Sequence, residues 1–354
     1  RVRDLNNKRL LELDNSYEYV DNETQKVISK YTVKTGDVVL SIVGTIGLVA
    51  IVGRTLDGAN LTENCVKLSS FHGVNRDFLY YYLRSDCGQQ EIRCGTVGAV
   101  QAKLPIKNIQ NIAINLPDYT TQERIASLLL SIDRKIELNQ KINDNLEQQA
   151  AALFSSLYNR SNTEVRYTDL IQILGGGTPK TGETAYWNGN IAFFTPKDVG
   201  TPYTFITEKT ITEEGLSHCN SRLYPVNTVF VTARGTVGKV GLSGVPMAMN
   251  QSCYALVGKE THQLLVYFYT LKAVDRLKHK ASGAVFDAIT TRDFDSEQIM
   301  KLSDDDAKAF LCVAEPMFQE ILNNSIENLR LSTLRDFLLP KLMSGEIDVS
   351  SVQL

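Results

Sequence analysis

Apolar side chains recur every three or four residues along residues 120–158, a stretch without glycine or proline. This spacing predicts a helix with one buried stripe, and such helices pair as coiled coils. At 1.5 Å per residue the helix would be roughly 58 Å long, which favours a second long helix as its partner over burial in one large core. The one six-residue gap in the stripe is filled by Asn139. Its apolar members are Ile125, Leu129, Ile132, Ile136, Ile142, Leu146, Ala150, Leu153 and Leu157.

A second stretch of the same kind, residues 304–342, is the expected partner. The two stretches share a Leu-Asn pair, at 138–139 and 322–323. We expect the helices to run antiparallel about a pseudo-two-fold axis, with the remaining parts of the chain at opposite ends. Asn139 and Asn323 near the seam would fix register and direction, unless they lie on the surface.

The segments before the two helices repeat one order of elements: strand, Gly-rich bend, strand, a further strand and a helix. In the first segment these are expected at 36–41, 44–47, 48–52, 61–68 and 78–85. In the second segment the first strand, the bend, the further strand and the helix are expected at 226–232, 234–238, 253–256 and 265–271. A Gly-rich loop is expected at 94–104, and its residues 98–101 match residues 283–286.

The alignment of the two copies is incomplete at its beginning. Residues 196–199 line up with residues 2–5, so residues 165–195 have no counterpart in the first copy. We expect the intact protein to carry that counterpart before Arg1.

These patterns predict an α+β protein with a pseudo-two-fold repeat. Two strand-rich domains of mixed α/β type would be separated by an antiparallel pair of long coiled-coil helices. The expected parts are a first domain at 1–117 with its N-terminal part missing, a spacer helix at 118–160, a second domain at 163–303, a second spacer helix at 304–345 and a tail at 346–354.

Composition narrows the class of protein. The net charge of −3 excludes a histone-like binder coated in basic surface, so any contact with nucleic acid should come from local patches on the two domains. The longest uncharged run, residues 38–53, is shorter than the roughly 20 residues of a membrane helix. Six scattered cysteines suggest thiols in a reducing compartment, so we expect a cytoplasmic protein.

Catalytic and metal motifs are missing from the sequence, and we expect a chain that is not an enzyme. Residues 175–184 resemble a phosphate-binding loop, but Glu183 replaces the lysine that would hold the phosphate. A loop with Lys180 reaching a DNA phosphate is the better interpretation. Asp133 and Lys135 point about 200° apart on a helix, so they cannot share a metal ion. No histidine or cysteine has the spacing of a metal site, so no metal is expected.

Basic and polar residues of the two domains are the candidates for DNA contact, although a single residue of this kind is more often a solvated surface charge. Arg234 and Lys239 gain weight because they flank the repeated bend. The candidates in the second domain are Thr178, Lys180, Lys197, Arg222, Arg234, Lys239, Lys280 and Arg292. Those in the first domain are Arg3, Lys8, Arg9, Arg54, Arg93 and Lys103.

Taken together, these features resemble the specificity subunit of type I restriction-modification enzymes. The motifs that carry the resemblance are Gly-Gly-Thr-Pro at 176–179, Tyr-Trp-Asn-Gly at 186–189, the two bends, Pro117 with Gln-Glu-Arg-Ile-Ala at 122–126, and the closing segment 337–347.

The resemblance implies two target-recognition domains that each read one half of a split double-stranded DNA sequence. The helices would hold methyltransferase subunits, and restriction and translocase subunits would join them. Methyl donor, ATP and magnesium would belong to those partners, so no cofactor is expected on this chain. On the helices, Arg124, Lys135 and Arg335 are the candidates for the partner surface.

Two other functions remain open from the sequence. One is an autonomous DNA-modifying or DNA-cleaving enzyme with an unrecognised site. The other is a coiled-coil scaffold that binds only proteins, whose behaviour would not depend on salt.

Overall fold

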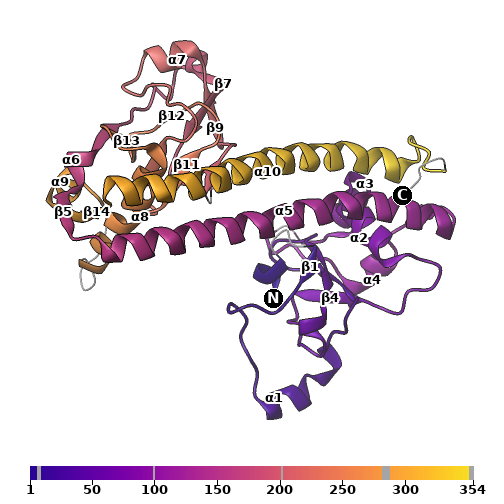
Figure 1. The fold of residues 1–354 in the computed structure, drawn as a ribbon. Coiled ribbons are helices and arrows are strands. Elements are labelled where there is room, and N and C mark those ends of the chain that lie inside the picture. Colours follow the sequence, from indigo (N-terminus) through magenta and orange to yellow (C-terminus); the bar gives the residue numbers. More distant parts are fainter. Residues whose placement is uncertain (6–8, 99, 201, 281–287, 351–354) are drawn as a thin grey trace. The chain divides into compact units, whose positions relative to one another are not determined.

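A computed structural model describes residues 1–5, 9–98, 100–200, 202–280 and 288–350 (Figure 1). The chain forms two compact units, Arg1–Glu137 with Asn328–Leu354 (the first unit) and Leu138–Glu327 (the second unit). Each unit contains one strand-rich domain and about half of each long helix. Among the described residues, no helix combines the length and the apolar character that spanning a membrane requires.

The strands are β1 (Leu10–Leu11), β2 (Val38–Ser41), β3 (Val49–Val52), β4 (Cys65–Leu68), β5 (Thr163–Arg166), β6 (Ile171–Gly175), β7 (Trp187–Phe194), β8 (Tyr203–Thr204), β9 (Lys209–Ile211), β10 (Val229–Thr232), β11 (Val240–Ser243), β12 (Met247–Met249), β13 (Cys253–Gly258) and β14 (Gln298–Lys301). The helices are α1 (Asn22–Val27), α2 (Arg76–Arg84), α3 (Asp86–Gly95), α4 (Ile106–Gln110), α5 (Tyr119–Arg160), α6 (Tyr167–Leu170), α7 (Glu213–Ser217), α8 (Gln263–Lys280), α9 (Thr291–Ser296) and α10 (Asp304–Ser344). Short 3-10 helices are η1 (Val2–Leu5), η2 (Ser29–Tyr31), η3 (Arg54–Leu56) and η4 (Thr184–Tyr186).

The sheets of the two units share one topology. In the first unit the strand order is β1-β3-β2-β4, and in the second unit it is β8-β11-β10-β13-β6. The outer strand is parallel in both, since β1 pairs with β3 and β8 pairs with β11 in parallel, while the other pairs are antiparallel. The predicted internal repeat is therefore present in the fold.

Within the residues that the structure describes, the second sheet has one strand more than the first. Strand β6 pairs with β13, whereas β4, the counterpart of β13, is the last strand of its sheet among the described residues. Strands β6 and β7 both lie in residues 165–195, the segment for which the sequence predicts no counterpart. Strand β7 also forms a second sheet with β12 and β9.

Both long helices are confirmed, and in each unit their halves pack antiparallel. In the first unit, Asp133 of α5 contacts Arg335 of α10, and Leu129 shares an apolar cluster with Leu342. In the second unit, Asn143 contacts Asn324 and Arg160 contacts Asp306. Residues later in α5 therefore contact residues earlier in α10, as in an antiparallel pair. Pro316 lies inside α10 without ending it.

The seam of the helix pair differs from the prediction at its polar positions. Asn139 is fully buried as expected, but the next seam position is Asn143, while Ile142 is 37% exposed. On α10 the buried residue is Asn324, and the predicted Asn323 is exposed. On α5 the buried stripe continues from Ile136 to Asn139 and then to Asn143, in steps of three and four residues. A search for apolar residues alone therefore selected Ile142 in place of Asn143.

An apolar core anchors the helices to each domain. In the second unit, Phe154 of α5 packs against Phe268 of α8 and Phe310 of α10, with ring centroids 5.1 and 5.5 Å apart. In the first unit, α2 supplies the buried Phe78, Tyr80 and Tyr81 to the equivalent place. The aromatic helix is confirmed in both copies, whereas α3 falls partly in a segment expected to be a loop. The expected loop at 283–286 lies outside the described residues.

Candidate nucleic-acid interface

The bend between β10 and β11 is held by the side chain of Thr232. Its hydroxyl donates to the carbonyl of Thr236 and accepts from the amide of Lys239, at 2.9 Å for the latter. Gly235 has a φ of +82°, a conformation that residues with a Cβ rarely adopt. The tip of the bend is therefore rigid although Arg234, Gly235 and Thr236 are exposed.

The bend of the first unit is built in the same way. The Ser41 hydroxyl donates to the carbonyl of Thr45 at 2.6 Å and accepts from the amide of Leu48 at 2.8 Å. Gly44 has a φ of +78°. Thr232 and Ser41 are both fully buried, so each hydroxyl is part of the core that supports its bend.

The backbone just before each bend is fixed from two sides. In the second unit, the Ala233 amide donates to Ser252 at 2.8 Å, and the Ala233 carbonyl accepts from Ile289 at 2.9 Å. In the first unit, the Ile42 amide donates to Asn64 at 2.8 Å, and its carbonyl accepts from Leu104 at 2.9 Å. The residues that follow, Arg234 and Val43, therefore occupy equivalent positions on one scaffold.

In the second unit, a cleft of about 490 Å³ opens beside this bend. Positive charge dominates it, because Lys197, Lys209 and Arg234 face a single acid, Glu208. The Lys197 ammonium lies 3.4 Å from Glu208, but both side chains are largely exposed, so this ion pair is weak. The remaining polar residues of the cleft include Thr236 and Asn250. Such a cleft attracts polyanions and offers hydrogen-bonding groups to them.

The Gly-Gly-Thr-Pro loop packs beside the same cleft. A Cβ on Gly176 would lie 2.2 Å from the carbonyl oxygen of Asn250, so only glycine allows this close approach. Thr178 is half-buried, and its hydroxyl donates to the side-chain carbonyl of Gln251. The loop therefore positions the polar segment 250–252. Lys180 is exposed, and its carbonyl accepts from the Trp187 indole at 3.2 Å.

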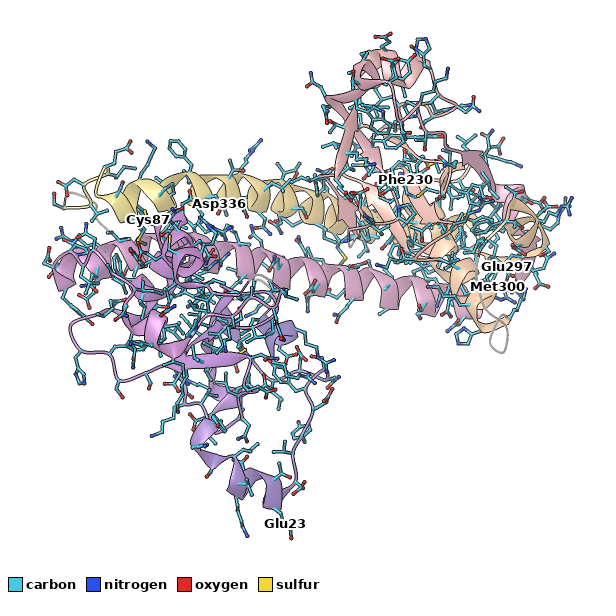
Figure 2. The ribbon with its side chains drawn as sticks, turned by 180° about the vertical axis from the view of Figure 1, so that it is seen from behind. Glu23, Cys87, Phe230, Glu297, Met300 and Asp336 are labelled. Atoms are coloured by element: carbon cyan, nitrogen blue, oxygen red, sulfur yellow. The ribbon has the colours of Figure 1, made fainter. Side chains whose placement is uncertain are left out.

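The other candidates of the second domain are spread over its surface. Arg222, Lys239 and Arg292 are exposed. The Lys280 ammonium lies 2.5 Å from the fully buried carboxylate of Glu297, which is also 3.2 Å from Arg276. Figure 2 shows Glu297 close to Met300 of β14. Lys280 therefore neutralises a buried acid in this structure.

The first domain does not bring its candidates into one cleft. Arg3 pairs with Glu18 at 2.5 Å, and Arg9 is mostly buried against Asp77 at 3.1 Å. Arg54, Arg93 and Lys103 are exposed at separate places. Lys8 lies outside the described residues.

The three helix candidates differ in their surroundings. Arg124 is half-buried and donates to the carbonyl of Ser350 at 2.7 Å. Arg335 is mostly buried against Asp133 at 2.8 Å and also pairs with Asp336, which lies on α10 (Figure 2). Lys135 is exposed.

Sequence reasoning missed Lys209, Asn250 and Gln251. The polar segment 250–252 directly precedes the strand that begins at Cys253, and the repeat aligns Cys253 with Cys65. This position next to a repeated strand could have identified Asn250 and Gln251 as candidates. Lys209 carried no sign in the sequence, because it joins the cleft through the pairing of β9 with β7. In the described part of the chain, no group of three or more His, Cys, Asp or Glu side chains could hold a metal ion.

Comparison with known proteins gives one consistent result. Residues 4–148 and 159–301 each match the family model described as type I restriction modification DNA specificity domain. The chain is 25% identical to the type I restriction enzyme HindI specificity subunit of Haemophilus influenzae, with 73% of each chain covered. It is 32% identical to the type I restriction enzyme MjaIX specificity subunit of Methanocaldococcus jannaschii, over 33% of this chain and 29% of that one.

A solved structure is similar in fold. It is the crystal structure of the type I restriction-modification system S subunit from M. genitalium, with a TM-score of 0.57 and 15% identity. The similarity covers 88% of this chain and 84% of that one.

Proposed function

We propose that this chain, which belongs to the family of type I restriction modification DNA specificity domains, reads a split double-stranded DNA sequence with its two strand-rich domains. We further propose that its paired helices bind methyltransferase subunits, to which restriction and translocase subunits are added. In this function the chain recognises DNA and has no catalytic site of its own.

The duplicated bend is the observation that supports DNA reading most strongly. Two copies of one rigid scaffold present exposed tips, and in the second domain the tip borders a basic cleft. Base recognition needs polar side chains held in a fixed position, whereas phosphate contact needs only cations. The cleft offers both kinds of group, with Arg234 and Asn250 for base edges and Lys197 and Lys209 for phosphates.

The exposed surface of the long helices supports the docking of protein partners. Large apolar side chains on these helices are open to solvent, and such side chains often mark interaction sites. They include Leu138 and Ile142 on α5, and Val313, Leu334 and Phe337 on α10. We propose that methyltransferase subunits contact Leu138, Ile142 and Val313 in the second unit. In the first unit we propose contacts with Leu334, Phe337 and Lys135, on a surface that Arg124 and Arg335 stabilise.

A binding selection tests this function. Duplexes with two randomised windows, separated by spacers of varied length, would be selected by the purified chain with and without a type I methyltransferase subunit. We expect enrichment of two fixed half-sequences at one spacer length. Binding that shows no preference in either arm would refute the proposal. Methylation or cleavage by the chain alone would instead identify an enzyme.

A further inference from the structure

We infer that Arg234 reads a base in the half-sequence bound by the second domain, and that Val43 holds the equivalent reading position in the first domain. This inference rests on the proposed function. It names one base-contacting position per domain and gives a chemical reason why the two half-sequences differ.

The equivalence of the two positions follows from the backbone. Arg234 forms an antiparallel bridge with Ala288, and Val43 forms one with Lys103. Each residue is followed by a glycine with positive φ, Gly235 or Gly44. Because the hydrogen bonds on both sides of the two bends also match, the side chains of Arg234 and Val43 leave their scaffolds in the same direction.

The Arg234 side chain is available for a ligand. It is exposed at the edge of the cleft, and within the described part of the chain its guanidinium forms no hydrogen bond or ion pair. Two other arginines of the second domain have acidic partners, since Arg276 is bound to the buried Glu297 and Arg166 pairs with Asp169. Arg222 and Arg292 are exposed, but they do not line this cleft.

A rigid attachment favours a base over a phosphate as the ligand. The guanidinium can donate two parallel hydrogen bonds, which match the O6 and N7 acceptors of guanine in the major groove. A phosphate contact needs no such precision and is open to the flexible Lys197 and Lys209 of the same cleft. We therefore expect Arg234 to require guanine at one position.

Val43 has no donor, so it cannot make the same choice. A branched apolar side chain at that position contacts the methyl group of thymine or makes no specific contact. One scaffold with different side chains at its tip therefore gives two unlike half-sequences.

The reciprocal variants Arg234→Val and Val43→Arg test the inference in the selection described above, with Arg166→Ala as a control that also removes one arginine from the second domain. For Arg234→Val, we expect discrimination at one guanine of one half-sequence to fall by about 10- to 100-fold, with the other half-sequence unchanged. For Val43→Arg, we expect a new requirement for guanine in the other half-sequence. The control should keep both preferences, and the melting temperatures should show that all variants are folded.

Each other outcome has a definite meaning. Uniform weakening of binding by Arg234→Val at every sequence would show that Arg234 holds a phosphate, and would overturn the inference. Unchanged sequence preferences in both reciprocal variants would overturn the inference as well. The proposed function would still stand in that case, provided that the wild type selects a split sequence. A wild type without any preference would instead remove the proposed function itself.

Discussion

The carboxylate of Asp133 on α5 lies 2.8 Å from the guanidinium of Arg335 on α10 and accepts a hydrogen bond from the Tyr81 hydroxyl at 2.6 Å. Asp133 and Tyr81 are buried, and Arg335 is mostly buried. Burial raises the pKa of Tyr81, so its hydroxyl keeps its proton and donates. This network joins α2, α5 and α10 within the first unit.

The second unit has apolar residues where this network stands. The buried positions of α5 and α10 correspond when Ile125 is aligned with Phe310, Leu129 with Ala314 and Leu157 with Leu342. The same alignment places Phe318 at the position of Asp133 and Ala150 at the position of Arg335. Both are buried, so the helix pair does not need a charge there to pack.

Arg335→Leu should destabilise the first unit by about 2–4 kcal/mol, because it leaves the carboxylate of Asp133 buried without its cation. The triple variant Tyr81→Phe, Asp133→Leu, Arg335→Leu removes every polar member and should recover most of that loss. Hydrogen exchange of peptides from the first half of α5 would measure both effects. If the triple variant were as unstable as the single one, the network would stabilise the first unit by more than the neutralisation of the Asp133 carboxylate.

The bend hydroxyls should control the mobility of the bends. Thr232→Val leaves the Lys239 amide and the Thr236 carbonyl without their partner, at a cost of about 1–3 kcal/mol. We expect faster hydrogen exchange at the Lys239 amide and weaker discrimination in the second domain's half-sequence. Thr232→Ser keeps the hydroxyl and serves as the control. Ser41→Ala should have the same effect on the Leu48 amide in the first unit.

The pKa of Glu147 should give the second unit a distinct pH dependence. Burial raises this pKa above 4.5, and the hydrogen bond from the Tyr267 hydroxyl lowers it only in part. Because the pKa of Glu147 is raised in the folded state, its contribution to the free energy of unfolding is most favourable below pH 4.5. That contribution is lost as pH rises through the folded-state pKa. Glu147→Gln should therefore raise the free energy of unfolding at pH 7 relative to the wild type. The difference between the two should vanish toward low pH, and a difference that does not depend on pH would contradict this assignment.

The cysteines should divide by reactivity toward iodoacetamide at pH 8. Burial raises the pKa of the Cys253 thiol to about 12 and also raises that of Cys65, so neither forms much of the reactive thiolate. Cys87, Cys94 and Cys312 are exposed. Mass spectrometry of the native protein should find these three modified first. Rapid labelling of Cys253 would show that the core beneath the bend opens easily.

Much of the fold could be predicted because it depends on local periodicity and on repetition. The two long helices, the bends and the aromatic helix all follow from spacing within a short window. The polar seam could not be placed correctly, because Asn143 and Asn324 are buried through their contact with each other, and only the packed pair shows which asparagine faces inward. Strand β8 was also not visible, since its two residues pair with β11 through tertiary contact alone.

The candidate site was predictable only in part. Arg234 was favoured because it flanks the repeated bend, and it shares the cleft with Lys197, which was selected by charge alone. Lys239 flanks the same bend but does not line the cleft. Arg9 and Lys280 were selected by charge in the same way, yet each contacts an acid inside its own unit. A single sequence gives the charge of a side chain but not the partner that the fold provides for it.

The shorter sheet of the first unit has a consequence for solubility. An outer strand offers its backbone hydrogen-bonding groups to any other extended chain, which is the first step of edge-to-edge aggregation. In the middle of β4 stands Lys67, which is exposed and donates to the carbonyl of Thr32 at 2.5 Å, where the corresponding residue of β13 is the buried Ala255. A charge at that position makes association through the edge unfavourable. Among the described residues, β4 thus carries a charge that opposes edge-to-edge pairing at the strand where the two sheets differ.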